Sequence, residues 1–214
     1  MMLNAKSNAN AVLFVADPDL PLPPAIPRGR TNCGDIDIRI ARDGTWYHEG
    51  SPIGRLELVK LFAGTLTRDR SEGYWLVTPA EMARIRVDDA PFIAVDMLVF
   101  GQGRDQVLTF RTNIDESITC DDRHPIRVAI DPKTGEPSPY VTVRQRMEAR
   151  IVRSVYYDLV SLGTEEKVNN ESVFGVWSAG TLFILGRLDD AGIDGAATQA
   201  GAPTPFGAPR EAGS

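Results

Sequence analysis

Arginine is the residue type whose clustering in this sequence points most clearly to chemistry. Its guanidinium group is a planar fork of donors that suits a phosphate or a carboxylate, whereas lysine offers a point charge. Six arginines fall within one strand, turn and helix unit: Arg123, Arg127, Arg144, Arg146, Arg150 and Arg153. The alternative is that these side chains pair with Asp and Glu on a solvated surface, since the chain carries 29 acidic residues.

The spacing of these residues suggests an anion site. We expect Arg144 and Arg146 near the start of a long helix, where free backbone amides and the helix dipole favour an anion. Tyr140 and Trp46 can each stack on a ligand's ring. Arg55 is expected beside the start of an earlier helix, where it contacts the anion or pairs with an acidic neighbour. The predicted ligand-binding residues are therefore Arg55, His48, Tyr140, Arg144 and Arg127.

The remaining reactive residues predict neither a metal site nor a catalytic set. A zinc site needs three or four ligands, and His48, His124, Cys33 and Cys120 meet only if two halves of the chain face each other there. There is no Gly-x-Ser-x-Gly elbow and no Gly-rich phosphate loop. The sequence identifies no cofactor, and the two cysteines, far apart, are expected to be reduced thiols.

Composition excludes several classes of protein. Of the 214 residues 43% are hydrophobic and 24% are charged, which is typical of a globular protein. A net charge of −6 argues against general nucleic-acid binding, which needs clustered basic residues. No segment reaches the ~18 apolar residues of a membrane span, and no signal peptide is evident. We therefore expect a cytoplasmic protein without a membrane span.

The chain repeats one order of elements. In the first pass, residues 36–40 alternate as a strand, Asp43-Gly44 forms a turn, and Ser51-Pro52 begins a helix. In the second, residues 126–130 form a strand, Asp131–Gly135 a turn, and a helix runs from Met147 to Leu162. Hairpin strands follow each helix. The predicted fold class is α+β, with two similar, mostly antiparallel β units that each hold one main helix.

Four segments follow from this pattern. Residues 1–30 are a proline-rich, extended segment, and residues 191–214 are a Gly-, Ala- and Pro-rich disordered tail. Between them we expect an N-terminal domain at residues 31–115 and a C-terminal domain at residues 116–190.

Several short motifs resemble a known family. They are Cys33–Ile36, Asp43–Gly50, Ile53–Arg55, Leu76–Glu81, Asp89–Phe92, His124-Pro125 and Pro139–Val141. In this order they resemble a bacterial family of unknown function, DUF1285, over roughly Asp19 to Asp189. The resemblance implies a duplicated core whose C-terminal half is similar to a pleckstrin-homology fold. It also implies a small, nucleotide-like ligand between the halves and a role in signal transduction, and it assigns no catalytic residues.

Three functions fit these observations. The favoured one is a ligand-binding or signalling module that holds a small anionic, nucleotide-like ligand between its two domains. The alternative is a protein-interaction scaffold whose sheet edges accept an extended strand from a partner. The third is a hydrolase of small phosphoesters with His48 or His124 as the acid–base residue, although nothing local requires an enzyme.

Overall fold

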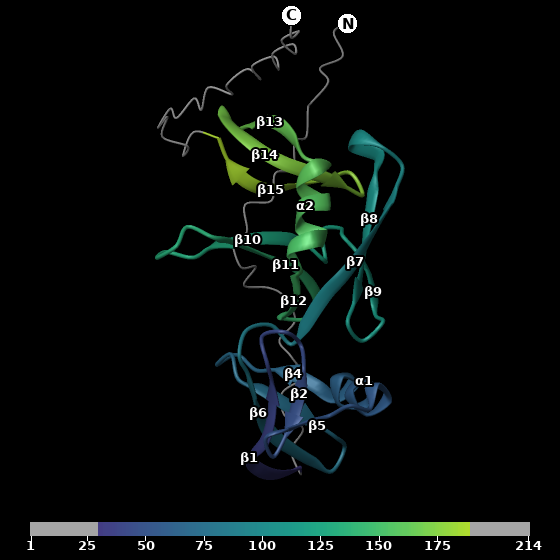
Figure 1. The fold of residues 1–214 in the computed structure, drawn as a ribbon, viewed down its shortest axis with the longest axis vertical. Helices are drawn as coiled ribbons and strands as arrows, with labels where there is room; N and C mark the ends of the chain where they lie inside the picture. The colour runs from purple at the N-terminus through teal and green to yellow at the C-terminus, as the bar shows by residue number, and fades with distance from the viewer. Residues whose placement is uncertain (1–29, 189–214) are drawn as a thin grey trace, which may run out of the picture.

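The computed structural model describes residues 30–188, which form three β-sheets and two α-helices (Figure 1). The expected extended segment at residues 1–30 and the expected disordered tail at residues 191–214 lie outside this range, apart from Arg30. The sequence prediction of an α+β fold with duplicated units is confirmed.

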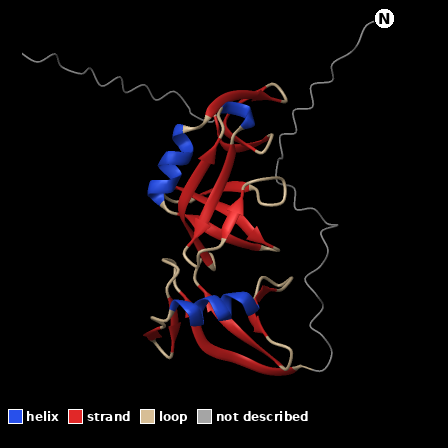
Figure 2. Cartoon of the chain, turned by 90° about the vertical axis from the view of Figure 1, so that its right-hand side faces the viewer, coloured by secondary structure: helices blue, strands red, loops and turns tan. Residues whose placement is uncertain are grey.

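The first sheet has six strands in the order β3-β2-β1-β6-β5-β4. Its strands β1 and β6 are parallel, and every other neighbouring pair is antiparallel. The strands are β1 (Thr31–Ile40), β2 (Trp46–His48), β3 (Ser51–Pro52), β4 (Leu66–Arg68), β5 (Tyr74–Val77) and β6 (Glu81–Val87). The helix α1 (Leu56–Thr65) links β3 to β4 and lies across the sheet (Figure 2).

The second sheet repeats this topology, in the order β10-β11-β12-β7-β8-β9. Its first strand β7 and last strand β12 are again parallel, and the other pairs are antiparallel. The strands are β7 (Phe92–Phe100), β8 (Val107–Thr112), β9 (Ser117–Thr119), β10 (Ile126–Ile130), β11 (Pro137–Arg144) and β12 (Met147–Ile151); a short 3-10 helix, η1 (Gly103–Asp105), lies in the β7–β8 connection. Each sheet thus consists of two three-stranded meanders, and the first strand of the first meander pairs with the last strand of the second.

After the second sheet come α2 (Arg153–Ser161) and a three-stranded antiparallel sheet. The sheet contains β13 (Thr164–Val168), β14 (Glu171–Ser178) and β15 (Thr181–Arg187). Within residues 30–188, neither helix is long and apolar enough to cross a membrane. The likeness of this half to a pleckstrin-homology fold stays a prediction.

The boundary between the halves differs from the expected one. The first sheet ends with β6 and the second begins with β7, so the chain changes sheet in the loop Asp88–Pro91. The expected boundary, between residues 115 and 116, would lie within the second sheet, in the turn between β8 and β9. The hairpin strands after the first helix therefore belong to two different sheets, a division that local alternation does not show.

Both predicted helix starts are corrected. Ser51-Pro52 forms the edge strand β3, and α1 begins at Leu56 with Arg55 as its N-cap and no side-chain cap. Met147–Ile151 is strand β12, so the second helix is confined to Arg153–Ser161. Alternate residues of this strand are buried, although good helix formers fill the segment. Pairing with β11 and β7 on both sides outweighs that local preference.

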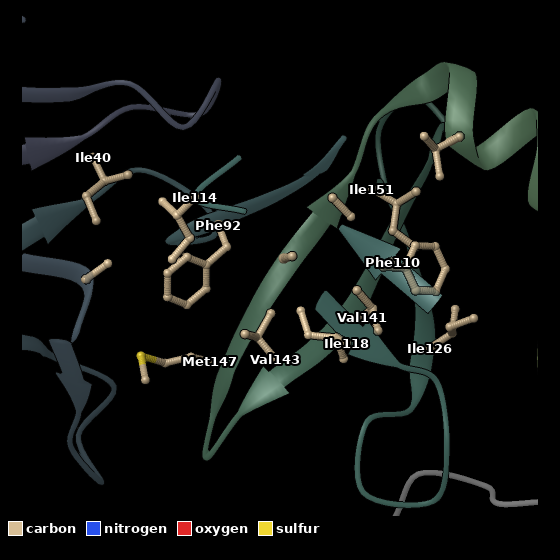
Figure 3. Packing of buried hydrophobic residues seen from close by; sticks show 14 of the residues in the cluster. Ile40, Phe92, Phe110, Ile114, Ile118, Ile126, Val141, Val143, Met147 and Ile151 are labelled. Carbon is tan, nitrogen blue, oxygen red and sulfur yellow. The ribbon is translucent and has the colours of Figure 1, made fainter. Parts of the chain in front are cut away.

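One hydrophobic core runs through both halves. The first sheet contributes Ile38, Ile40 and Trp46, and α1 contributes Val59 and Ala63. The second sheet contributes large, fully buried side chains such as Phe92 and Phe110, and α2 contributes Leu159. Figure 3 shows the passage between them, where Ile40, Phe92, Ile114, Val143 and Met147 lie in one cluster. Because this core is continuous, the halves form a common interior instead of touching only through polar side chains.

Candidate functional site

A cluster of charged side chains gathers around Asp89, in the loop that joins the halves. Its Oδ1 accepts a hydrogen bond from the Tyr140 hydroxyl at 2.9 Å. Its Oδ2 lies 3.4 Å from Arg42 Nε, in the β1–β2 turn, and 3.5 Å from Arg150 Nε, on β12. Arg150 also donates from Nη2 to the Arg42 carbonyl at 3.1 Å. Asp89 therefore joins side chains from both sheets.

Arg127 and Glu148 lie beside these four residues. We call the six together the junction cluster: Arg42, Asp89, Arg127, Tyr140, Glu148 and Arg150. Arg127 Nε and Nη2 each donate to one oxygen of the Glu148 carboxylate at 2.6 Å. The Arg127 guanidinium also lies over the Tyr140 ring, 4.3 Å from the ring centroid. This bidentate pair and the ring contact hold Arg127 in one orientation.

The surroundings change the acidity of two of these groups. The carboxylate of Glu148 raises the pKa of Arg127. Burial raises the pKa of Tyr140, and the hydrogen bond to Asp89 and the negative charge of Asp89 act in the same direction. Tyr140 is therefore a neutral donor to Asp89 over a wide pH range.

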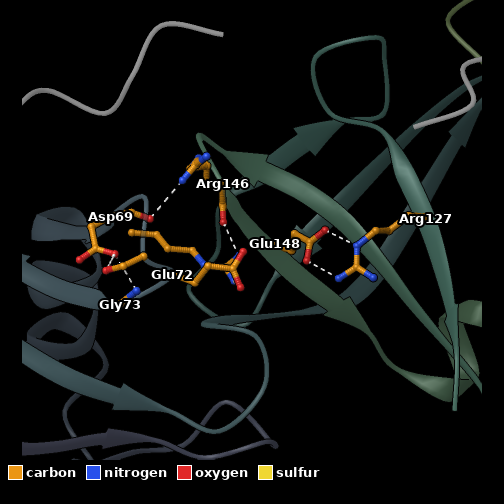
Figure 4. A network of polar contacts seen from close by, with 8 residues as sticks. Asp69, Glu72, Gly73, Arg127, Arg146 and Glu148 are labelled. Carbon is orange, nitrogen blue, oxygen red and sulfur yellow. Dashed lines mark hydrogen bonds and ion pairs between the residues drawn. The ribbon is translucent and has the colours of Figure 1, made fainter. Parts of the chain in front are cut away.

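A second polar contact joins the halves between two turns, as Figure 4 shows. Arg146, in the turn between β11 and β12, donates to the Asp69 carbonyl at 3.2 Å. In return, Arg68 donates to the Arg146 carbonyl at 3.0 Å. Asp69 itself is held by Ser71, Gly73 and Trp75, which each donate to its carboxylate. These reciprocal contacts hold the two turns together across the junction.

Arg144 has a structural role in the same region. It ends strand β11, so the expectation that it lies at a helix start is wrong. Its Nη2 donates to the Ala63 carbonyl in the last turn of α1 at 3.0 Å. Its guanidinium lies 5.2 Å from the centroid of the Phe92 ring and 3.7 Å from a carboxylate oxygen of Glu116. Arg144 thus gives the Ala63 carbonyl, which also accepts the Leu66 amide, a second donor from across the junction.

Two predicted residues do not join the cluster. His48 ends strand β2 and Arg55 caps α1, and both are exposed. Within residues 30–188, no hydrogen bond or ion pair reaches either side chain. The two pairing partners that we considered for Arg55, Glu49 and Asp43, make no contact with it in this part of the chain.

The expected stacking of a ligand's ring also changes. Trp46 is only 1% exposed and lies in the core, so its predicted stacking role is wrong. Tyr140 is 7% exposed, and Arg127 covers one face of its ring. Among the predicted residues, only Arg127 and Tyr140 come together, and Tyr140 contributes its hydroxyl and not an open ring face.

The histidines and cysteines stay apart. His124 Nδ1 lies 2.8 Å from Asp121 Oδ1 within one loop, where the carboxylate also accepts local backbone amides. Cys33 is exposed, whereas Cys120 is buried in the core, where burial raises the pKa of its thiol. In the part of the chain that the structure describes, no three His, Cys, Asp or Glu side chains group as a metal site.

Sequence reasoning missed Asp89, Arg42, Arg150 and Glu148 as cluster residues. At the level of sequence, the Asp89–Phe92 motif enters only the family resemblance, whereas the Asp89 carboxylate contacts Tyr140 and two arginines. The motif was a usable signal, because Asp89 lies two residues before Pro91 in the loop where the chain changes sheet, and a side chain there can reach both halves. Arg42 and Glu148 carried no local signal.

Comparison with known families supports the division into halves. The N-terminal domain of DUF1285, described as a domain of unknown function, matches residues 26–90. Its C-terminal domain, from a protein of unknown function, matches residues 91–185. The chain belongs to the DUF1285 family. Its two family domains meet between residues 90 and 91, in the loop where the chain changes sheet.

Two crystal structures of DUF1285 family proteins are similar to this chain. The one from Silicibacter pomeroyi DSS-3 is 45% identical, covers 79% of this chain and 92% of its own, and has a TM-score of 0.69. The one from Shewanella baltica OS155 is 25% identical, covers 59% and 91%, and has a TM-score of 0.48. No curated protein matches the chain.

Proposed function

We propose that this DUF1285 protein is a binding module for a small anionic, phosphate-bearing ligand, and that the junction cluster is the site. The observation that carries the proposal is the arrangement around Asp89. Tyr140 and two arginines from different sheets converge there, in the loop that joins the two family domains.

The charge of the cluster favours an anion. Three guanidinium groups (Arg42, Arg127 and Arg150) share two carboxylates (Asp89 and Glu148), which leaves one positive charge. The whole chain has a net charge of −6, so these six side chains carry a positive surplus within an acidic protein, with Asp131 also within electrostatic reach of Arg42. A local surplus of this sign attracts and concentrates small anions.

Unused donors are also present. Arg127 is committed to Glu148 by two short hydrogen bonds, but Arg42 is 66% exposed and holds Asp89 only at 3.4 Å. Within residues 30–188, the buried Nε of Arg150 and the buried Oδ2 of Asp89 have no hydrogen-bond partner, although the two atoms lie 3.5 Å apart. Arg42 can therefore donate to a phosphate without breaking a close internal bond, and Asp89 and Arg150 orient it.

The test is thermal unfolding of the full chain against inorganic phosphate, pyrophosphate and a panel of nucleotides. A ligand present at about 100 times its Kd stabilises the folded state by about 2.7 kcal/mol. For a protein of this size, that corresponds to a rise of about 5–11 °C in Tm. We expect at least one phosphate compound to produce such a rise.

A matched pair of variants locates the site. Arg42→Gln should abolish the ligand-induced rise, whereas Arg86→Gln should retain it, because Arg86 is a similarly exposed arginine (71%) whose ion pairs are with Asp88 and not with a cluster residue. No rise with any phosphate compound, or equal loss in both variants, would contradict the proposal.

A further inference from the structure

The turn that carries Arg42, between β1 and β2, is held by two side chains of the second half. The Arg42 carbonyl accepts a hydrogen bond from Arg150 Nη2 at 3.1 Å. Two residues further on, the Gly44 carbonyl accepts one from Asn113 Nδ2 at 3.3 Å. The backbone of a turn in the first sheet is therefore fixed by residues that belong to the second.

Asn113 lies in the β8–β9 turn and is half-buried. Its side-chain Oδ1 accepts a hydrogen bond from the Ile93 amide at 3.0 Å, while Nδ2 donates to Gly44. Its backbone amide donates to the Ile93 carbonyl at 2.8 Å. A backbone N–H requires the amide oxygen and a carbonyl requires the amide nitrogen, so these partners allow one orientation of the side chain. Asn113 is thus anchored to β7 and presents its nitrogen to the turn of Arg42.

The packing around Gly44 leaves this turn little freedom. Gly44 is buried with φ +82°, and a Cβ added there would lie 2.7 Å from Asn113 Nδ2 and 2.6 Å from Ile93 Cγ1. The Arg42 side chain, in contrast, is 66% exposed, and its ion pair with Asp89 is 3.4 Å long. Because the guanidinium is held loosely, the backbone of the turn decides where it lies.

We infer that Asn113 is a positioning residue for the anion site: through the Gly44 carbonyl, it sets where Arg42 meets a phosphate group. The inference rests on the proposed function of the junction cluster. Within residues 30–188, no hydrogen bond joins the Asn113 side chain to a cluster residue. A guanidinium binds phosphate through an aligned fork of donors, so a displaced turn weakens binding although no charge is removed.

The competing role is confined to β7, since Asn113 also bonds to Ile93. Two substitutions separate the roles. Asn113→Asp keeps an oxygen for the Ile93 amide and loses the donor to Gly44, whereas Asn113→Ala loses both bonds. If Asn113 only supports β7, Asn113→Asp should bind an anion as the wild type does. If it positions Arg42, both variants should bind more weakly.

The test is calorimetric titration of the full chain with pyrophosphate, well below the unfolding transition. We expect Kd to rise about two- to tenfold in both Asn113 variants, the range that corresponds to one neutral hydrogen bond. The charge added by Asn113→Asp also repels the anion, but that part of the loss should shrink as ionic strength is raised. Ser178→Ala is the matched control, because it removes buried hydrogen bonds on β14 and should keep the wild-type Kd.

A measurement without ligand separates failure of the positioning role from failure of the proposed function. The Gly44 amide donates to the Ala41 carbonyl at 2.9 Å within the turn. Its hydrogen exchange should be faster in both Asn113 variants than in the wild type and in Ser178→Ala.

Unchanged exchange at Gly44 overturns the positioning role. It is also overturned if pyrophosphate binds equally well to the wild type and both Asn113 variants, or if Ser178→Ala weakens binding as much as they do. In each of these cases the wild type can still bind pyrophosphate, and the proposed function stands. A wild type that does not bind pyrophosphate, even with faster exchange in the variants, contradicts the anion site, and the positioning role falls with it.

Discussion

The hydrogen bond between Tyr140 and Asp89 is expected to contribute measurably to stability. Its oxygen atoms are 2.9 Å apart, Tyr140 is buried, and the acceptor is a carboxylate. A hydrogen bond to a charged group contributes about 1.5–3 kcal/mol. Tyr140→Phe removes the hydroxyl and keeps the ring, so the free energy of unfolding should fall by about 2 kcal/mol. In a protein of this size, Tm should fall by about 4–8 °C.

A double-mutant cycle isolates this contact from the others that Asp89 makes. Urea unfolding of wild type, Tyr140→Phe, Asp89→Ala and the double variant should give a coupling energy of about 1–2 kcal/mol, with unchanged m-values. Tyr157→Phe is the control, because Tyr157 is 61% exposed and the change should stay within about 0.5 kcal/mol. A coupling energy below about 0.5 kcal/mol would refute the reasoning, because the two losses would then be independent.

Three other predictions concern the same region and the core. Burial and Asp89 raise the pKa of Tyr140, so the folded protein holds this proton more tightly than the unfolded chain does. The free energy of unfolding should therefore fall as pH rises above about 10, and Tyr140→Phe should flatten that fall in urea titrations. An unchanged dependence on pH in the variant would contradict the assignment to Tyr140. Gly44 has φ +82°, and an added Cβ would lie 2.6 Å from Ile93, whereas Gly50 has φ +75° and open space around it. Gly44→Ala should therefore lower the free energy of unfolding by about 1–3 kcal/mol more than Gly50→Ala does. Equal unfolding free energies for the two variants would refute the packing argument. The fully buried Ser178 Oγ accepts a hydrogen bond from the Leu108 amide at 2.9 Å and donates one to the Cys120 carbonyl at 2.6 Å. Ser178→Ala should lower the free energy of unfolding in urea by about 1–3 kcal/mol. A neutral change would show that the Leu108 amide and the Cys120 carbonyl find other partners.

Alternation and turn chemistry account for the parts of the fold that the sequence predicts well. The Ile38 and Ile40 side chains face the core from β1, and Asp43-Gly44 forms the turn that follows, with Gly44 in the left-handed region. The Asp131–Gly135 turn likewise joins β10 to β11. These features depend on neighbours in the chain, so local patterns are sufficient.

Features that depend on distant pairing were missed or misplaced. The residues of β12 fit both a strand and a helix, and the pairing of Ala149 with Val141 on β11 and with Phe92 on β7 decides between them. The same pairing brings Arg150 to Asp89, while Glu148 on the same strand meets Arg127. Arg127 and Tyr140 could be selected from the sequence because they lie on neighbouring strands of one hairpin. Arg42 could not, because it reaches the cluster from the other sheet.

The most direct test of the anion site is to observe the arginine side chains themselves. Nitrogen-15 NMR of the arginine Nε groups, followed during titration with pyrophosphate, separates each guanidinium. We expect saturable shifts for Arg42 and Arg150, with Arg86 unmoved as an internal reference. Shifts confined to Arg86 and other surface arginines, or no saturable shift at Arg42 and Arg150, would contradict this expectation.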